Sequence, residues 1–291
     1  MDDKELFWLA GLLEGEGLFQ KGAPCEPKYP QIKINMTDYD VITHVTNLFD
    51  VTYIQTSIPK YDHWKPNYGT LVKGKRAVRL MCQLYPLMGE RRRQQIETAI
   101  GDKPAVLTEY APTDENWFYW LAGLLEGEGS FQIQVKGEGR SDQPKLNLKM
   151  TDKDVVEHFA LLLNTHVLGP YKLSGGPESA NWKPAYDASV FGEIALEWMQ
   201  RLRPYMGERR QAQIGTVIAG YHPKPRTYHY GESHHQAKLT ADSVRTIKQR
   251  IRQGVKLTAL AREYGVDTGL IWQIKAGRIW QQVPWPEDAE A

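Results

Sequence analysis

A fourteen-residue segment occurs twice in this chain, and that repeat constrains the fold more than any other feature. FWLAGLLEGEGLFQ spans residues 7–20 and YWLAGLLEGEGSFQ spans residues 119–132, with the same residue at twelve of the fourteen positions. Three further pairs of blocks match in the same order: 33–42 with 147–156, 63–68 with 181–186, and 84–96 with 202–214. The repeat distance of 112 to 118 residues is the size of a domain half and too long for a solenoid. The sequence therefore predicts a tandem duplication.

Composition places few other limits on the chain. The apolar and charged fractions, 41% and 24%, are typical of a globular protein, and 291 residues suffice for one or two cores with a small appendage. No apolar run approaches the roughly 20 residues of a membrane span. The first residues, MDDKELF, lack the pattern of a signal peptide, and Cys25 and Cys82 are the only cysteines. We therefore expect an intracellular, cytoplasmic protein without a disulfide framework.

Positive charge is concentrated near the C-terminus, although the whole chain carries only +1. Residues 221–283 contain eleven lysines and arginines and four acidic residues, a net charge of +7. A basic segment on a nearly neutral body suggests a polyanion-binding appendage. A solvated basic tail is the alternative that composition leaves open.

Each half has the pattern of a mixed α/β unit. In the first half, helical patterns cover 4–15, 39–49, 75–85 and 89–100, and extended patterns cover a stretch from residue 18 and the segments 31–36, 51–58 and 68–72. The candidate helix N-caps are Asp2 or Asp3, Asp38, and Thr113 or Asp114. The order is αββαββα, with the last helical part in two segments, and we expect two pseudo-twofold-related antiparallel sheets, each built from hairpins. The predicted domain organisation is a first half at 1–107, a linker at 108–116, a second half at 117–220, a linker at 221–237 and a small all-α domain at 238–283.

The basic segment itself predicts a helix-turn-helix unit. Residues 239–280 contain three short helical patterns, whose apolar stripes include Val244, Leu257 and Leu270, with Gly254 and Gly265 between them. Helices joined by a tight turn that contains glycine are typical of a DNA-reading motif. A generic three-helix cap is the alternative.

Small residues line the repeated helix. Ala10, Gly11 and Gly15 recur at spacings of one helical turn. Small side chains let two helix backbones approach closely. We therefore expect the two copies of this helix to pack together where the halves join.

Acidic residues lie at the C-terminal end of each copy of the helix. Glu14 and Glu16 are repeated as Glu126 and Glu128, and the helix macrodipole disfavours negative charge at that end. A divalent cation held between one acid of each copy would offset this cost. Residues two apart point about 200° from each other on a helix. Only one acid per copy can therefore face the junction, and spacing does not decide which.

The segment LAGLLEGEG, at 9–17 and again at 121–129, resembles the signature of the LAGLIDADG homing endonucleases, which single-chain members of that family carry twice. The resemblance extends over residues 1–220 and includes the MTD-x-D and P-x-MGERR blocks. It implies a saddle of two sheets that lie in successive major grooves of double-stranded DNA. The basic tail resembles helix-turn-helix appendages of phage and bacterial homing enzymes, so a bacterial or phage-encoded mobile element is the expected source.

The same resemblance implies a metal site. The second acid of the motif binds metal in that family, which corresponds to Glu16 and Glu128, and the preceding residue lends a backbone carbonyl, here Gly15 and Gly127. Glu stands where the name-giving motif has Asp, and its extra methylene could shift geometry and rate. The expected cofactor is Mg²⁺ or another divalent cation such as Mn²⁺, with Ca²⁺ expected to bind without supporting cleavage.

The resemblance also implies a basic residue after the P-x-x-x segment, which corresponds to Arg91 and Arg209. Such a cation could stabilise charge that develops on a phosphate, and a solvated helix face is the alternative. Outward positions of the strands, the lysines of the two W-K-P segments and the tail supply candidate DNA contacts, because Gln and Asn can pair with adenine and Lys with guanine or phosphate. Ordinary polar strand faces are the alternative. The candidates are Gln20, Lys33, Asn35 and Lys65 in the first half, Gln132, Gln134, Asn147, Lys149 and Lys183 in the second, and Thr268, Gln273, Lys275 and Arg278 in the tail.

Together these features predict a monomeric, metal-dependent, site-specific DNA endonuclease that hydrolyses one phosphodiester in each strand of a long, nearly asymmetric duplex target. A non-catalytic DNA-binding transcriptional regulator on the same scaffold is an alternative, although decayed scaffolds of that kind lose the acids that this chain retains. An RNA-splicing maturase is a third reading of the sequence.

Overall fold

The computed structural model describes residues 1–22, 29–59, 61, 63–101, 115–135, 142–171, 183–222 and 237–286. The chain divides into two compact units, Met1–Pro223 and Lys224–Ala291. Most of both predicted linkers, 108–116 and 221–237, lies outside the described residues. Within the described ranges, no helix is long and apolar enough to cross a bilayer.

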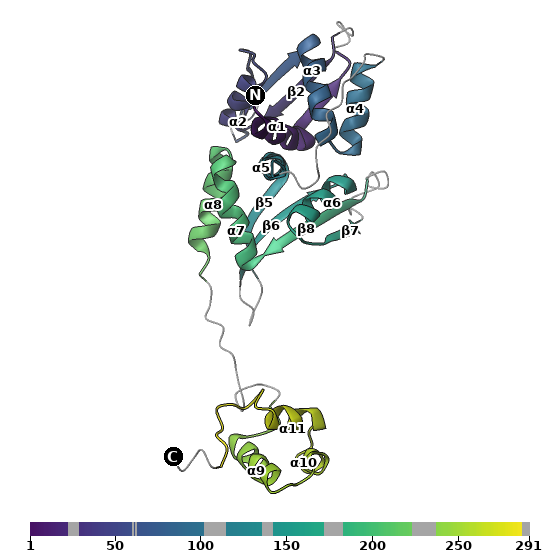
Figure 1. Ribbon diagram of the computed structural model, residues 1–291. Coiled ribbons are helices and arrows are strands. Elements are labelled where there is room, and N and C mark those ends of the chain that lie inside the picture. Colours follow the sequence, from purple (N-terminus) through teal and green to yellow (C-terminus); the bar gives the residue numbers. More distant parts are fainter. Residues whose placement is uncertain are drawn as a thin grey trace. The chain divides into compact units, whose positions relative to one another are not determined.

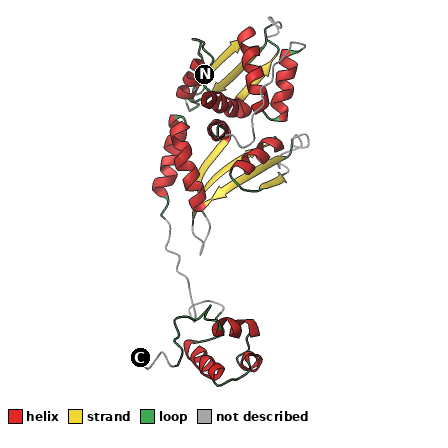
Figure 2. Cartoon of the chain, viewed as in Figure 1, coloured by secondary structure: helices red, strands yellow, loops and turns green. Residues whose placement is uncertain are grey.

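The two halves of the first unit have the same order of elements (Figures 1 and 2). The first half contains α1 (Asp3–Glu16), β1 (Gly17–Gln20), β2 (Gln31–Met36), α2 (Tyr39–Leu48), β3 (Gln55–Ser57), β4 (Asn67–Lys73), α3 (Lys75–Leu84), the 3₁₀ helix η1 (Tyr85–Leu87) and α4 (Glu90–Ile100). The second half contains α5 (Trp117–Glu128), β5 (Gly129–Gln134), β6 (Gln143–Met150), α6 (Lys153–Leu162), β7 (Val167–Tyr171), β8 (Ala185–Phe191), α7 (Gly192–Leu202), the 3₁₀ helix η3 (Arg203–Tyr205) and α8 (Glu208–Gly220). The mixed α/β class and the repeated αββαββα order are therefore confirmed, with the last helical part interrupted by a 3₁₀ helix.

Each half builds one antiparallel sheet, in the orders β1-β2-β4-β3 and β5-β6-β8-β7. Side chains alternate between the two faces of a strand. In β2, Ile32 and Ile34 are buried in the core, whereas Lys33 and Asn35 lie on the outer face. The predicted strand at 51–58 is wrong in extent, because only Gln55–Ser57 pair, as an exposed edge strand.

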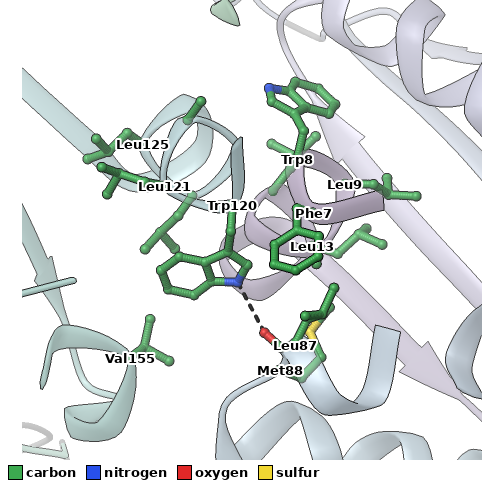
Figure 3. Packing of buried hydrophobic residues seen from close by; sticks show 14 of the residues in the cluster. Phe7, Trp8, Leu9, Leu13, Leu87, Met88, Trp120, Leu121, Leu125 and Val155 are labelled. Carbon is green, nitrogen blue, oxygen red and sulfur yellow. Dashed lines mark hydrogen bonds between the residues drawn. The ribbon is translucent and has the colours of Figure 1, made fainter. Parts of the chain in front are cut away.

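The helices α1 and α5 pack side by side between the two sheets (Figure 1). A Cβ atom built on Gly11 would lie 1.9 Å from the carbonyl oxygen of Trp120, and one built on Gly123 would lie 1.9 Å from that of Trp8. Only glycine permits this approach, so the predicted close packing of the two copies is confirmed. Aromatic and aliphatic side chains of both helices form the core around this contact (Figure 3). Two indole N–H groups also donate hydrogen bonds to backbone carbonyls of the other half: Trp120 to Leu87 at 3.1 Å, and Trp8 to Tyr205 at 3.0 Å.

Helix caps follow the sequence in one case and depart from it in another. Asp2 caps α1 in a capping box with Glu5, as expected. Asp38 occupies the N-cap position of α2 but makes no capping hydrogen bond, because its carboxylate binds an arginine of the other half. Thr113 and Asp114, the candidate caps of the second motif helix, lie outside the described residues.

The described part of the second unit, residues 237–286, contains three helices, α9 (Ala241–Arg252), α10 (Leu257–Glu263) and α11 (Thr268–Lys275), at the three places where the sequence predicts them. Gly254 and Gly265 have φ values of +84° and +63° in the two turns, a conformation that favours glycine. These helices share a core of their own: Leu239, Val244, Ile247, Leu260, Ala261, Ile271, Ile274 and Val283. Lys248 is buried in α9 and donates hydrogen bonds from Nζ to the carbonyls of Trp280 and Val283, which ties the last described segment to this core.

Candidate active site at the junction of the two halves

The last acid of each motif helix lies against the opposite motif. A Cβ built on Gly15 would lie 2.7 Å from Cγ of Glu128, and one built on Gly127 would lie 3.0 Å from Cγ of Glu16. Each carboxylate-bearing side chain thus occupies the space that the opposite glycine leaves open. The C-terminal ends of α1 and α5 meet at this place, which we call the junction.

The two junction acids are partly buried like charges. Burial raises the pKa of Glu16 and of Glu128, and the negative charge of Glu128 raises the pKa of Glu16 further. Among the hydrogen bonds and ion pairs of the described residues, none involves either carboxylate. Two adjacent acids that make no ion pair or hydrogen bond with the described side chains form an arrangement that a bound cation would stabilise.

The first acid of each motif is instead buried in the protein. Glu14 and Glu126 are fully buried, and Oε2 of each accepts a hydrogen bond from a backbone N–H, of Gly89 and Gly207 respectively, at 2.7 Å. Burial raises the pKa of Glu14 to about 7 and also raises that of Glu126. The structure thereby decides what spacing alone left open, since the second acid of each motif is the one that faces the opposite motif.

The two predicted basic residues form ion pairs with the opposite half. Arg91 donates from Nε to Asp152 at 2.6 Å, and Arg209 donates to Asp38 at 2.8 Å. The charge of Arg91 acts to lower the pKa of Glu128, but burial has the larger effect and the pKa is raised overall. These guanidinium groups therefore lie within electrostatic reach of the junction acids. Their action on a phosphate stays a prediction.

The second acid of each MTD-x-D block also binds across the halves. Oδ2 of Asp154 accepts from the N–H of Glu90 at the start of α4, and Oδ2 of Asp40 accepts from the N–H of Glu208 at the start of α8, both at 2.7 Å. A carboxylate at a helix N-terminus is favoured by the helix dipole. The MTD-x-D and MGERR blocks thus hold the halves together reciprocally, a function that the sequence did not indicate.

The next arginine of each ERR block reaches the motif helix itself, and sequence analysis missed it. Arg92 donates from Nε to the carbonyl of Glu14 at 2.9 Å and from Nη2 to the carbonyl of Gly15 at 2.6 Å. Arg210 makes the same two bonds to the second motif, at 3.0 and 2.8 Å. Burial lowers the pKa of Arg92 to about 10. Successive residues of a helix point about 100° apart. Arg91 therefore faces Asp152 of the other half, while Arg92 is directed at the motif helix of its own half.

The oxygen atoms at the junction fit a hard divalent cation. Within the described parts of the chain, no cluster of three or more His, Cys, Asp or Glu side chains could hold a metal by itself. The junction instead offers two carboxylates, Glu16 and Glu128, and the carbonyls of Gly15 and Gly127. Mg²⁺ is typically bound by one or two carboxylates together with water and other oxygen ligands, so this donor set suits such a cation.

In the first half, the outer face of the sheet carries the predicted DNA contacts. Gln20 pairs with Gln31 at the end of β1, and Lys33 and Asn35 follow at alternate positions of β2. The Asn35 side chain lies over Gly69 of the neighbouring strand. Lys65, just before β4, is exposed, as are Lys183 before β8 and Lys149 at the end of β6.

In the second half, two outer-face residues differ from expectation in their surroundings. Asn147 donates to Ser189 Oγ at 3.2 Å and to Asp187 at 3.3 Å, so its amide is already bound within the sheet. Lys145 pairs with Gln132 on the outer face and was not selected from the sequence, although the two-residue period of β6 indicates it. Gln134 lies opposite Gln143 at the end of the same ladder.

The predicted contacts of the tail lie on α11 and just after it. Thr268 begins the helix, and Gln273 and Lys275 are exposed. Trp272, which the sequence analysis passed over, is 47% exposed and shares a face with Thr268 and Lys275 by helical spacing. The guanidinium of Arg278 lies 4.8 Å from the centre of its indole ring.

No protein-family model matches this chain, and no curated protein matches its sequence. Solved structures with a similar fold are LAGLIDADG homing endonucleases. The LAGLIDADG meganuclease I-AabMI, bound to uncleaved DNA, has a TM-score of 0.49 at 13% identity, with 74% of this chain and 91% of that chain covered. The LAGLIDADG homing endonuclease I-LtrWI, bound to target DNA, has a TM-score of 0.41 at 15% identity, with 75% and 92% covered. I-GzeII, in complex with a DNA target, has a TM-score of 0.43 at 10% identity, with 75% and 92% covered. At these values the likeness concerns the backbone fold alone.

Proposed function

We propose that this chain is a divalent-metal-dependent, site-specific endonuclease of double-stranded DNA that acts as a monomer. The observation that carries the proposal is the position of Glu16 and Glu128, adjacent across the junction and without a partner among the described protein groups. Burial raises the pKa of both carboxyl groups, so keeping them ionised at this place has a cost. A role that needs negative charge at one point accounts for that cost better than stability does.

In this mechanism each half serves one DNA strand. Glu16 and Glu128, with the carbonyls of Gly15 and Gly127, would hold the divalent metal. Bound divalent metal polarises the phosphoryl group and lowers the pKa of a coordinated water. Pairing with aspartates orients Arg91 and its counterpart in the second half, so that a positive charge stands near the phosphate on each side.

The outer faces of the two sheets would position the duplex and read its bases. Each face presents amide and lysine side chains at alternate strand positions, which suits hydrogen bonding in a major groove. The three-helix unit would add contacts outside the central site, because a second tethered DNA-binding module raises affinity without new contacts at the first.

A selection on randomised duplex DNA tests the proposal. Duplexes that the full chain retains in Ca²⁺ are recovered, sequenced and then incubated with the chain in Mg²⁺. We expect both strands of the selected duplexes to be cut at defined positions, and EDTA to stop the reaction. Selected duplexes that are bound but never cut in Mg²⁺ or Mn²⁺ would identify a DNA-binding protein without nuclease activity.

The matched variants are Glu16→Gln and Glu128→Gln, with Glu197→Gln as the control. Each junction variant keeps the size of the side chain, so DNA binding should persist while double-strand cleavage falls at least 100-fold, as expected when a metal ligand loses its charge. Glu197 is exposed on α7, and its variant should cleave like the unmodified chain. Full cleavage by the double variant Glu16→Gln/Glu128→Gln would refute the mechanism.

A further inference from the structure

An arginine fork binds the end of each motif helix. The last carbonyls of a helix have no partner within the helix. In α1, those of Glu14 and Gly15 accept hydrogen bonds from Nε and Nη2 of Arg92. The remaining nitrogen, Nη1, donates to the side chain of Gln95 at 3.0 Å, so all three nitrogens of the guanidinium are engaged.

The second half repeats this arrangement with its own residues. Arg210 donates from Nε and Nη2 to the carbonyls of Glu126 and Gly127, and from Nη1 to Gln213 at 3.1 Å. Both arginines are buried, with 3% and 7% of their surface exposed. Two copies with the same atoms and the same partners indicate a geometry that the fold holds in common.

The fork acts on a carbonyl that the metal site needs. A carbonyl oxygen has two lone pairs, so a bond from Arg92 to Gly15 still leaves one lone pair for a cation. Position 15 has to be glycine because the Glu128 side chain occupies the space of a Cβ, and glycine is the residue with the most backbone freedom. A guanidinium that donates to two successive carbonyls restricts this freedom and fixes the direction of the Gly15 carbonyl.

Electrostatics alone would argue against an arginine at this place. The charges of Arg92 and Arg210 both lower the pKa of Glu16, so they stabilise the ionised acids. The same positive charges repel a divalent cation a few ångströms away. Charge and geometry therefore predict opposite effects of removing the arginine on metal affinity, and the sign of the effect distinguishes them.

We propose that Arg92 and Arg210 are positioning residues that hold the Gly15 and Gly127 carbonyls as metal ligands. The inference rests on the proposed metal site at the junction and adds the groups that orient it. The positioning contribution exceeds the repulsion, so loss of the fork weakens metal binding even where the positive charge is removed with it.

Binding of Mn²⁺ to the full chain without DNA, followed by the loss of the free-ion EPR signal, tests this proposal. Arg92→Lys keeps the charge and loses the fork, and Arg92→Gln loses both. We expect each to weaken Mn²⁺ binding about tenfold, the usual effect of removing a group that orients a metal ligand. Arg93→Lys is the matched control, because Arg93 is exposed in the next position of the same helix and should change nothing.

A buried arginine is also a folding risk, so two further variants accompany these. Gln95→Ala removes only the anchor of Nη1 and should weaken Mn²⁺ binding two- to threefold. Arg210→Lys repeats the test in the second half. Circular dichroism before each titration identifies the variants that are folded.

The outcomes separate the two proposals. An Arg92→Gln variant that binds Mn²⁺ more tightly, or an Arg92→Lys variant that binds like the unmodified chain, refutes the positioning role while the metal site stands. A Glu128→Gln variant that binds Mn²⁺ like the unmodified chain refutes the metal site itself. Loss of binding in Glu128→Gln together with the weakened binding of both Arg92 variants supports both proposals.

Discussion

The close contact between the motif helices can be tested by adding one methyl group. A Cβ on Gly11 would lie 1.9 Å from the carbonyl oxygen of Trp120 and 2.7 Å from the backbone nitrogen of Leu124. An ordinary contact of this kind is about 3.4 Å, so Gly11→Ala requires the helices to separate by more than 1 Å at this point. Because both obstructing atoms belong to a backbone, no side-chain rotation relieves the overlap.

The expected loss follows from two opposing effects. Overpacking of a well-packed core costs about 1–3 kcal/mol, and backbone obstruction places this site at or above the upper end, about 3–4 kcal/mol. Replacing glycine by alanine inside a helix returns about 1 kcal/mol. The net destabilisation is about 2–3 kcal/mol, which for a unit of this size lowers the melting temperature by roughly 5–10 °C.

Thermal unfolding followed by circular dichroism measures this change, with Gly215→Ala as the control. Gly215 also lies inside a helix, α8, but a Cβ there would meet only the flexible end of Arg203 at 3.3 Å. The control should be neutral or more stable by up to about 1 kcal/mol. A Gly11→Ala variant that melts within 2 °C of the unmodified chain would show that the two helices do not approach as described.

Three further outcomes follow from the contacts described above. Asp38→Ala should lower the free energy of unfolding by about 2 kcal/mol. Arg209→Ala should lower it less in the Asp38→Ala background than in the unmodified chain, because the two side chains form one ion pair. His158 packs against the rings of Trp117 and Trp120, and burial lowers its pKa, so the unfolded chain takes up its proton first as the pH falls below about 6.5. The contribution of His158 to stability should therefore decrease from pH 6.5 towards pH 5, whereas the raised pKa values of Glu14, Glu16, Glu126 and Glu128 act in the opposite direction. Denaturant titrations should show that His158→Phe gains stability relative to the unmodified chain as the pH falls over this range. Lys248→Met should leave two carbonyls without their donor, and faster amide exchange in segment 277–286, equivalent to about 1–2 kcal/mol, would report it.

Repetition made much of the fold accessible from the sequence. The strand 31–36 was predicted with its observed limits, because alternation of Ile32 and Ile34 with polar residues recurs at the matching place in the second half. The strand at 51–58 was overestimated, since edge pairing depends on what the neighbouring strand offers and residues 51–54 do not pair. A local pattern does not contain that information.

The location of the site could be predicted from the sequence, but only some of its side-chain contacts could. Spacing showed that one acid per motif faces the junction, but the rotation of α1 about its axis is set by packing against α5, so Glu14 and Glu16 could not be distinguished by spacing. The same limit applies to Arg91 and Arg92, which are adjacent in sequence: Arg91 forms an ion pair with Asp152 of the other half, and Arg92 is directed at the carbonyls of its own motif helix. Both choices depend on tertiary contacts from the other half of the chain.

The outer faces of the two sheets differ at positions that match in the repeat. Lys33 and Asn35 of β2 correspond to Asn147 and Lys149 of β6. The junction is nearly symmetric, yet the surfaces that it joins are not copies of each other. For the proposed nuclease, a palindromic site would match one surface and mismatch the other, so we expect single-base changes at mirror-related positions of a bound site to have unequal effects.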